Sequence, residues 1–277
     1  MCIRDRDIAG KGVIVTRTLV RLGEQAVHLT HLGGPFRDFF KLGARKERIK
    51  LTIIPARAGI RFCVTLLDAT QARTTEIVPE GDEISPEVEK RFRRAFIRLL
   101  PRARCVIISG SKAPGYADSF YPDLVRAATA AGRCTVIDFR GPDLAAALPA
   151  GPAIVTPNRT EFMQTFFPDD DPTSRTPETN TLLANKLREL SSSVRSAFVL
   201  TDGDREIIIG AAGKVTTLTP GTVQAVNTTG CGDVFTAALA AAVMKKQDLS
   251  DAVIFAERQA RAAALSPRPG FVLPERY

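Results

Sequence analysis

Short apolar runs alternate with longer amphipathic segments through the second half of the chain. The apolar runs fall at residues 105–108, 134–137, 153–155 and 197–200, and each has the length and residue types of a buried strand. Longer segments separate them, among them a predicted helix over residues 118–131. Strands that alternate with helices are typical of parallel βαβ units. The pattern therefore predicts an α/β fold with a mostly parallel central sheet.

The first part of the chain has a different pattern. Shorter apolar runs at residues 26–32, 51–54, 60–67 and 74–78 are separated by turns rich in glycine, proline and aspartate. We expect these runs to form a meander of short strands that lies over the main domain as a small sheet. The predicted lid strands thus fall within residues 26–80.

Two helices are also predicted in this first part. The apolar positions between Val13 and Leu22 have helical spacing and are followed by a glycine, although residues 13–15 alone would also suit a strand. A second helix follows Ser85, which is suited to the N-cap position, and runs to about Leu100.

Composition limits the class of protein. The chain has 277 residues, of which 44% are hydrophobic and 25% charged, a globular composition for which one α/β domain is ordinary. No apolar run is long enough to span a bilayer, so we expect no membrane partner. The five cysteines are scattered without a C-x-x-C pair, and we interpret them as free thiols in a reducing cytoplasm.

The net charge of +8 raises the question of a nucleic-acid partner. The basic residues are spread through the predicted helices without interleaved aromatic residues, and tryptophan is absent. We therefore expect no nucleic-acid partner, and we interpret the charge as a solvated basic surface together with a site for an anionic substrate.

The most informative stretch runs from residue 222 to residue 243. It predicts a short strand, a glycine turn and a long alanine-rich helix. Gly230 and Gly232 flank Cys231, so the turn can adopt backbone angles that are closed to most residues. Free N–H groups and the helix dipole form an anion site there. Asp233 stands at its mouth, where its carboxylate could either cap the helix or take a proton from an acceptor hydroxyl during phosphoryl transfer.

Several polar or glycine-containing segments directly follow predicted strands. These segments are residues 109–111, Asn158, residues 201–203 and residues 230–233. The carboxyl ends of parallel strands meet along one edge of a sheet, where α/β proteins bind their ligands. We therefore predict that the four segments form one site.

The same candidate residues also have structural interpretations. Ser111 belongs to a segment rich in glycine and proline, which is typical of an ordinary turn. Asn158 followed by Glu161 is typical of a helix capping box. Lys11 and Arg61 are equally consistent with solvated surface charges.

Other kinds of active site are disfavoured. His28 and His31 are the only histidines, and they alternate with apolar residues in a predicted strand, so we interpret both as structural. The sequence contains no G-x-x-x-x-G-K-[ST] loop and no zinc-ligand spacing. Asp233 is therefore the stronger candidate for a catalytic base.

Several segments resemble the signatures of the pfkB, or ribokinase-like, carbohydrate kinases. Residues 227–233, NTTGCGD, are similar to the family's NTxGAGD, with cysteine in place of alanine. Residues 9–12 match part of GGKGxNxA, while Ile14 stands at the position of its asparagine. Residues 109–115 resemble SGSLPPG, and residues 158–161 fit NxxE.

Further segments indicate a branch of that family. Residues 201–206 match TxGxxG in part, because Glu206 stands at the last glycine. Arg61 falls where the hexose-phosphate branch has TRxN, and residues 74–85 resemble that branch's TTEINEPGPEIS. The chain is therefore most similar to 1-phosphofructokinases and tagatose-6-phosphate kinases.

The resemblance implies a ribokinase-like three-layer α/β/α sandwich with a small β lid. It implies one kinase domain over residues 1–277, with a nucleotide-binding part over about residues 100–277. The implied activity is ATP-dependent phosphorylation of a hexose phosphate with Mg²⁺, either of fructose 1-phosphate to fructose 1,6-bisphosphate or of tagatose 6-phosphate. A homodimer formed through the lid sheet is implied as well.

The resemblance also carries roles over to the matching residues. Asp233 is then the catalytic base, and Gly230, Cys231 and Gly232 form the anion hole. Nucleotide binding falls to Asn158, Thr201, Gly203 and Gly232, with Glu161 near Mg²⁺. Sugar-phosphate binding falls to Gly10, Lys11, Arg61 and Ser111.

Departures from the family pattern leave alternatives open. The family's first strand and a substrate-binding aspartate have no counterpart, so we expect a truncated chain, and residues 1–7 match no structural pattern and are interpreted as foreign sequence. One alternative is a non-catalytic sugar-phosphate-binding remnant of the family. Another is a dinucleotide-binding oxidoreductase that uses Gly230 and Gly232, although Phe235 occupies its third glycine position.

Overall fold

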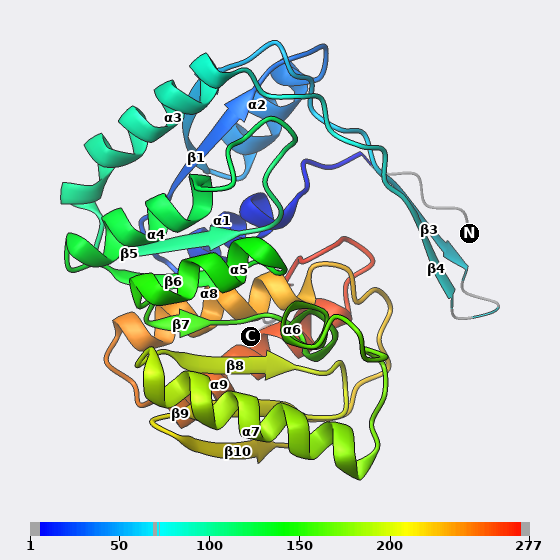
Figure 1. Cartoon of the computed structure of the whole chain (residues 1–277). Helices are drawn as coiled ribbons and strands as arrows, with labels where there is room; N and C mark the ends of the chain where they lie inside the picture. Colours follow the sequence, from blue (N-terminus) through cyan, green and yellow to red (C-terminus); the bar gives the residue numbers. More distant parts are fainter. Residues whose placement is uncertain (1–5, 69–70, 72, 273–277) are drawn as a thin grey trace.

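The computed structural model describes residues 6–68, 71 and 73–272. Its centre is a six-stranded sheet in the order β10-β9-β8-β7-β6-β5 (Figure 1). Neighbours from β5 to β8 are parallel, whereas the β8–β9 and β9–β10 pairs are antiparallel. The strands are β5 (Cys105–Ser109), β6 (Cys134–Asp138), β7 (Ile154–Val155), β8 (Ala197–Thr201), β9 (Ile207–Ala211) and β10 (Lys214–Leu218). The four predicted parallel strands are confirmed, and the β9–β10 hairpin is additional to them.

Helices cover both faces of this sheet, which gives the predicted three layers (Figure 1). One face carries α3 (Pro86–Leu99), α4 (Phe120–Ala130), α5 (Pro142–Ala147), α6 (Arg159–Phe166) and α7 (Pro177–Ser193), with the 3-10 turns η1 (Leu100–Arg102) and η2 (Leu148–Ala150). The other face carries α8 (Cys231–Met244) and α9 (Leu249–Ala264), with α1 (Lys11–Arg21) packed against α8. Within the described residues, no helix is both long enough and apolar enough to cross a membrane.

The strands of the sheet are buried on both faces. Ile137 and Phe198 point into the core under α3 to α7, and Val136 and Val199 point into the core under α8 and α9. All four side chains are fully buried. A parallel sheet covered on both faces needs apolar side chains at consecutive positions, which explains why uninterrupted apolar runs identify these strands.

The predicted meander is wrong for the first two strands. β1 (Val27–Leu32) and β2 (Lys50–Pro55) pair in parallel, and α2 (Arg37–Lys46) connects them. The helix forms because Phe40 and Ala44 lie one turn apart and are both buried in a small core of their own. The unit is therefore a βαβ unit rather than part of an antiparallel lid.

A separate hairpin corresponds to the predicted small sheet. β3 (Val64–Asp68) and β4 (Arg73–Ile77) pair in antiparallel fashion and extend beyond the central sheet at the right of Figure 1. The side chains of Phe62, Leu66 and Ile77 are 55, 55 and 57% exposed on or beside it. We call this hairpin the lid.

The segment before the glycine turn is not a strand, so that prediction is wrong. Residues 221–226 are irregular and exposed. The N–H of Val226 donates to the carbonyl of Ala264 at 2.8 Å, which places the segment beside the end of α9. Val223 has a strand-forming side chain, but strand propensity depends on a pairing partner and on burial, and this segment has neither among the described residues. The helix after the turn, α8, is confirmed.

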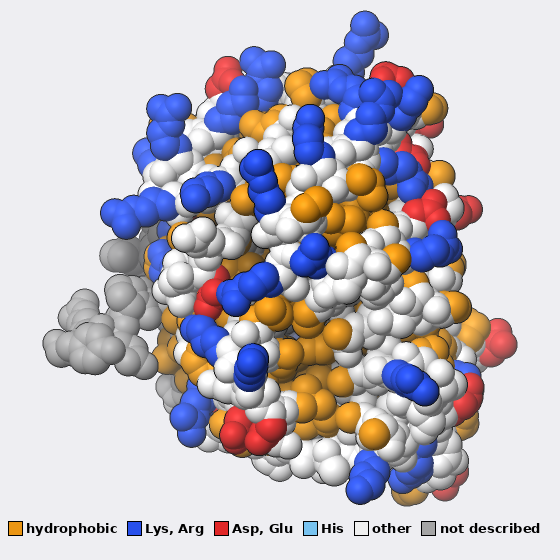
Figure 2. Space-filling view, turned by 90° about the vertical axis from the view of Figure 1, so that its left-hand side faces the viewer, with side chains coloured by type: hydrophobic (Ala, Val, Ile, Leu, Met, Phe, Trp, Pro, Cys, Tyr) orange, Lys and Arg blue, Asp and Glu red, His pale blue; other side chains and the backbone are white. Residues whose placement is uncertain are grey.

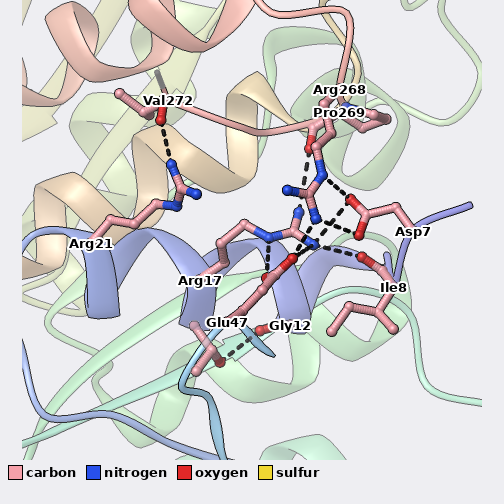
Figure 3. A network of polar contacts seen from close by, with 10 residues as sticks. Asp7, Ile8, Gly12, Arg17, Arg21, Glu47, Arg268, Pro269 and Val272 are labelled. Carbon is pink, nitrogen blue, oxygen red and sulfur yellow. Dashed lines mark hydrogen bonds and ion pairs between the residues drawn. The ribbon is translucent and has the colours of Figure 1, made fainter. Parts of the chain in front are cut away.

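A network of charged groups joins both ends of the described chain to α1 (Figure 3). Arg17 is 1% exposed, and its guanidinium donates to Glu47 at 2.6 Å, to the Asp7 carboxylate at 3.2 Å and to the Ile8 carbonyl at 2.7 Å. Arg268 donates to both oxygens of Asp7, at 2.6 and 2.7 Å, and also pairs with Glu47. Asp7 belongs to the segment interpreted as foreign, yet it takes part in the fold; residues 1–5 of that segment lie outside the described residues.

We predict that Arg17→Met lowers the free energy of unfolding by about 3–5 kcal/mol, because the partly buried carboxylates of Asp7 and Glu47 would lose a buried cation that apolar packing cannot replace. The urea midpoint, compared at an unchanged slope, measures the effect. Arg37→Met is the matched control, since Arg37 pairs with Asp38 at an exposed position, and a change below about 0.5 kcal/mol is expected. Equal losses in the two variants would contradict a special role for the network.

Candidate active site

The carboxyl ends of β5 and β6 carry two polar residues in direct register. Ser109 and Asp138 are strand partners, and the Ser109 hydroxyl donates to Asp138 Oδ2 at 2.9 Å. The end of β8 lies in the same row, because Thr201 forms an isolated parallel bridge with Asn158. The sheet thus brings Ser109, Asn158 and Thr201, which are far apart in sequence, to one edge.

The start of α1 adds a cation to this edge. Gly10 is the N-cap of α1 with a φ of 107°, a backbone angle that favours glycine. Lys11 then directs its Nζ to Asp138 Oδ1 at 3.3 Å and lies 3.8 Å from Glu161 Oε1. Burial alone would lower the pKa of Lys11, but the carboxylates of Asp138, Glu161 and Asp233 outweigh it and raise that pKa above its ordinary value.

Glu161 has two contacts of different kinds. Its Oε2 accepts from the Asn158 N–H at 3.0 Å, while its own N–H donates to Asn158 Oδ1 at 2.8 Å. This pair is a complete capping box, so the structural interpretation of the two residues is confirmed. The other oxygen, Oε1, remains directed toward Lys11. The helix cap therefore holds a carboxylate oxygen in the site.

The glycine turn before α8 is tightly constrained by its neighbours. Gly230 has a φ of +80°, and a Cβ there would lie 2.7 Å from Ile14 Cδ1 and 3.1 Å from the Gly270 Cα. Ile14 is itself buried against α8, in a small core with Val234. The position of the family's asparagine is thus occupied by a packing residue that fixes the turn.

Open space lies on the other side of the same turn. A Cβ on Gly232 would meet no atom within 4 Å. The Cys231 N–H donates to the Thr228 carbonyl, whereas no described residue accepts a backbone hydrogen bond from Gly232 or Asp233. Two free N–H groups at the start of a helix suit an anion. The predicted anion site is therefore geometrically available.

Asp233 does not cap the helix. Gly230 is the N-cap, and Asp233 occupies the third helical position without a side-chain cap hydrogen bond. Its side chain is nevertheless buried, at 5% exposure. Burial first, and then the charges of Asp138 and Glu161, raise the pKa of Asp233 to about 7, although Lys11 opposes the change. A carboxylate with such a pKa can both accept and release a proton near neutral pH.

Cys231 lies beside this carboxylate as a neutral thiol. Burial, and then the charge of Asp233, raise the pKa of Cys231 to about 11. Its Sγ lies 4.0 Å from the carbonyl of Asn227, the first residue of the signature. Asn227 is buried and donates to the Pro267 carbonyl while it accepts from the Thr229 N–H, so it fixes the shape of the turn.

The lid reaches the same turn. The Thr229 hydroxyl donates to Glu76 Oε1, on β4, at 3.0 Å. These two residues, with Thr228 and Gly230, line a hollow at the start of α8. A carboxylate of the lid thus lies at the mouth of the anion site, a contact that sequence reasoning did not anticipate.

Three of the predicted site residues stand apart from the charged cluster. Arg61 is exposed at the base of the lid, where Nη1 donates to the Pro79 carbonyl at 3.4 Å. Ser111 and Gly203 are exposed in the loops after β5 and β8. No hydrogen bond or ion pair among the described residues joins these three to Lys11 or Asp138.

The two histidines have structural contacts, as expected. His28 Nδ1 lies 3.1 Å from the Thr16 hydroxyl, and burial lowers the pKa of His28 to about 4. His31 Nδ1 lies 2.9 Å from the Tyr116 hydroxyl.

Asp138 is the residue that sequence reasoning missed. It is 3% exposed, ends β6 and contacts both Lys11 and Ser109. A signal was available, because a carboxylate directly follows the predicted strand over residues 134–137, at the edge where ligands bind. Among the described residues, no group of three or more His, Cys, Asp or Glu side chains forms a metal site by itself.

Comparison with known proteins identifies the family. The chain matches the pfkB family carbohydrate kinases over residues 5–276. A tagatose-6-phosphate kinase of Staphylococcus epidermidis is 26% identical over 248 residues, which cover 86% of this chain and 75% of that protein.

Solved structures share the fold. A possible 1-phosphofructokinase from Thermotoga maritima has a TM-score of 0.83 at 21% identity, covering 99% of this chain and 87% of that one. Phosphofructokinase-2 from Escherichia coli, in complex with substrates and products, has a TM-score of 0.82 at 20% identity, covering 94% and 82%. A tetrameric inhibited form of the Escherichia coli protein has a TM-score of 0.81 at 21% identity, and the match covers 92% of this chain and 82% of that one.

The family match spans nearly the whole chain, and the glycine turn, the buried aspartate and the capped NxxE segment all meet at one edge of a ribokinase-like sheet. This chain therefore belongs to the pfkB family of carbohydrate kinases.

Proposed function

We propose that this pfkB-family kinase transfers the γ-phosphoryl group of ATP to a hexose phosphate, either fructose 1-phosphate or tagatose 6-phosphate. The observation that carries the proposal is the buried, uncapped Asp233 beside the free N–H groups of Gly232 and Asp233. A proton acceptor and an anion site are adjacent there, which is the arrangement that phosphoryl transfer to a hydroxyl requires.

Asp233 is proposed as the catalytic base. In its ionised form it accepts the proton of the acceptor hydroxyl as the oxygen attacks phosphorus. Gly230, Cys231 and Gly232 form the anion hole, in which the turn presents its N–H groups to the transferring phosphoryl group. The neutral Cys231 thiol adds no second negative charge there.

The donor nucleotide is proposed to lie along the edge formed by Asn158, Thr201 and Gly203. Glu161 Oε1 and the Asp138 carboxylate, both directed at Lys11, fit a hydrated Mg²⁺, which usually takes one or two carboxylates, waters and phosphate oxygens. When bound, Mg²⁺ supplies positive charge to the phosphate oxygens of the donor. Lys11 is close enough to both carboxylates to hold them in place before the nucleotide binds.

The acceptor is proposed to bind between the start of α1 and the lid, through Gly10, Lys11, Arg61 and Ser111. A sugar phosphate carries a charge of about −2 near neutral pH, so cationic side chains suit it. The similarity to a tagatose-6-phosphate kinase supports this branch. Among the described residues no hydrogen bond or ion pair joins Arg61 to Lys11, so the acceptor phosphate is proposed to bridge the two cations.

The lid is proposed to pair with the lid of a second copy. Phe62, Leu66 and Ile77 expose apolar surface on or beside a hairpin whose two strands have no further pairing partner among the described residues. Exposed strand edges and apolar side chains favour association.

The non-catalytic sugar-phosphate binder stays the alternative function. Ligand binding would then raise the melting temperature without turnover.

We predict that Asp233→Asn lowers kcat by about 10²- to 10⁴-fold, the usual contribution of a general base. The Kd for ATP should change little, because the free N–H groups of the turn remain. Turnover and nucleotide titration measure the two quantities. Asp38→Asn, at an exposed position of α2, is the control and should keep wild-type kcat. A near wild-type kcat in Asp233→Asn would reject Asp233 as the base.

We also predict that the activity falls as the pH drops below about 7. Burial and neighbouring charges raise the pKa of Asp233 to about 7, and only the ionised form accepts a proton, so kcat/KM should fall by about tenfold per pH unit below that value and be constant above it. Lys11→Met removes the cation that lowers the pKa of Asp233, so it should move the break to higher pH. A flat profile from pH 5.5 to 8.5 would contradict the assignment.

For the acceptor, we predict that kcat/KM favours sugar phosphates over free sugars by at least about 10²-fold, because charge-assisted hydrogen bonds to the phosphate are absent with free sugars. Rates with fructose 1-phosphate, tagatose 6-phosphate, fructose 6-phosphate, fructose and ribose test this. Arg61→Ala should raise KM for the phosphorylated acceptor, while Arg57→Ala, also exposed, is the control. Equal rates on ribose and the sugar phosphates would place the chain among plain sugar kinases.

A further inference from the structure

Two cysteines face one another at the end of the sheet opposite the active site. Cys105 begins β5 and Cys134 begins β6, and the two residues are strand partners in the parallel register. The same register ends at Ser109 and Asp138, four residues along each strand, or roughly 13 Å away at 3.3 Å per residue. The pair is therefore remote from the residues assigned to catalysis.

Both thiols point to the same face of the sheet. Cys105 and Cys134 are partly buried, and both pack against the core under α8 and α9. The starts of the parallel strands lie toward the left of Figure 1, and Figure 2 shows that side of the molecule. Apolar side chains reach the surface there between lysine and arginine side chains. The two thiols are themselves only partly buried, which leaves them accessible to a small reagent.

The geometry of the pair suits a disulfide. Neighbouring strands lie about 4.7–4.9 Å apart, and a disulfide spans a Cα–Cα distance of about 4.4–6.8 Å. Because Cys105 and Cys134 are in register and share a face, no strand has to shift along its axis for the sulfur atoms to join. Cys63 lies exposed near the lid, and Cys231 lies at the α8 turn, so neither has such a partner among the described cysteines.

The two thiols also differ in reactivity. The hydrogen bond between them lowers the pKa of Cys134 to about 7, against the effect of burial, and the same bond together with burial raises the pKa of Cys105. The lowered pKa of Cys134 favours its thiolate, the nucleophilic form in thiol–disulfide exchange. Cys105 stays protonated and is suited to the second step.

We propose that Cys105 and Cys134 form a thiol-oxidation site that reacts with low-molecular-weight disulfides such as glutathione disulfide. In the first step the Cys134 thiolate attacks one sulfur of the reagent, forms a mixed disulfide and releases one thiolate. In the second step Cys105 loses its proton and attacks Cys134 Sγ, which forms the Cys105–Cys134 bond and releases the second thiol. The protein gives up two electrons, and the reagent disulfide is reduced to two thiols.

The test uses the full chain, folded and reduced, incubated with glutathione disulfide at neutral pH and then alkylated. The chain has five cysteines, so the expected product has three alkylated cysteines and no attached glutathione. Cleavage after arginine and lysine should give linked peptides 105–112 and 134–140. Five alkylated cysteines, or a linkage between any other pair, would overturn the proposal.

Single variants separate the two roles. Cys105→Ala removes the resolving thiol, so Cys134 should accumulate as a stable mixed disulfide, visible as a glutathione adduct by intact mass. Cys134→Ala should react far more slowly and carry no adduct on Cys105. Cys63→Ala, at an exposed position, is the control and should form the same disulfide as the wild type. An adduct on Cys105 but not on Cys134 would reverse the assigned roles and reject the mechanism; circular dichroism verifies that each variant is folded.

Discussion

The ion pair between Lys11 and Asp138 connects the first helix to the central sheet, and the charge state of the site depends on it. Asp138 ends β6, Glu161 is held by its own helix cap, and Asp233 lies in the first turn of α8. These three carboxylates come from separate elements and would repel one another in a buried setting. Lys11 acts on all three, and it is the group that opposes the rise of the Asp233 pKa. The position of α1 therefore sets the proton affinity of the proposed base.

The position of α1 is in turn fixed by its buried face. Ile14 packs against the glycine turn, so close that only glycine fits at positions 230 and 270. Three residues further along the helix, Arg17 joins the Asp7, Glu47 and Arg268 network. One surface of α1 thus holds the anion turn while its N-terminus supplies Lys11. A disturbance of the Arg17 network would reach the site through the backbone of this one helix.

The sequence identified the parts of the fold that depend on local pattern. Buried parallel strands have uninterrupted apolar runs, and the NTTGCGD turn needs a glycine at position 230 for steric reasons, so both could be predicted. The βαβ unit was missed because the burial of Phe40 and Ala44 depends on a core formed with distant residues. The strand prediction for residues 222–226 was wrong for a different reason: the residues have strand propensity, but the described part of the chain offers them no pairing partner.

In the candidate site, too, local sequence pattern predicted some residues, while others depend on contacts between distant parts of the chain. The capping-box interpretation of Asn158 and Glu161 is confirmed, whereas the functional roles carried over to the motif residues stay predictions. Asp138 belongs to no motif that was used, and Glu76 belongs to the segment 74–85 but was given no role; the sheet register and the lid contact bring them to the site. Spatial neighbours of this kind depend on topology, which a single sequence does not specify residue by residue.

The distribution of charge places a strict requirement on the proposed reaction. The chain carries a net charge of +8, yet its site gathers three carboxylates around one lysine, and Glu76 of the lid adds a fourth near the turn. Lysine and arginine side chains lie instead on the outer surface, as on the face shown in Figure 2. A triphosphate entering this site meets net negative charge at short range, where screening by salt is weak. The N–H groups of α8 and Lys11 offset part of that repulsion, and a divalent cation bound with the nucleotide offsets more. The acidic site is therefore compatible with the proposed phosphoryl transfer, provided that the nucleotide arrives with a divalent cation.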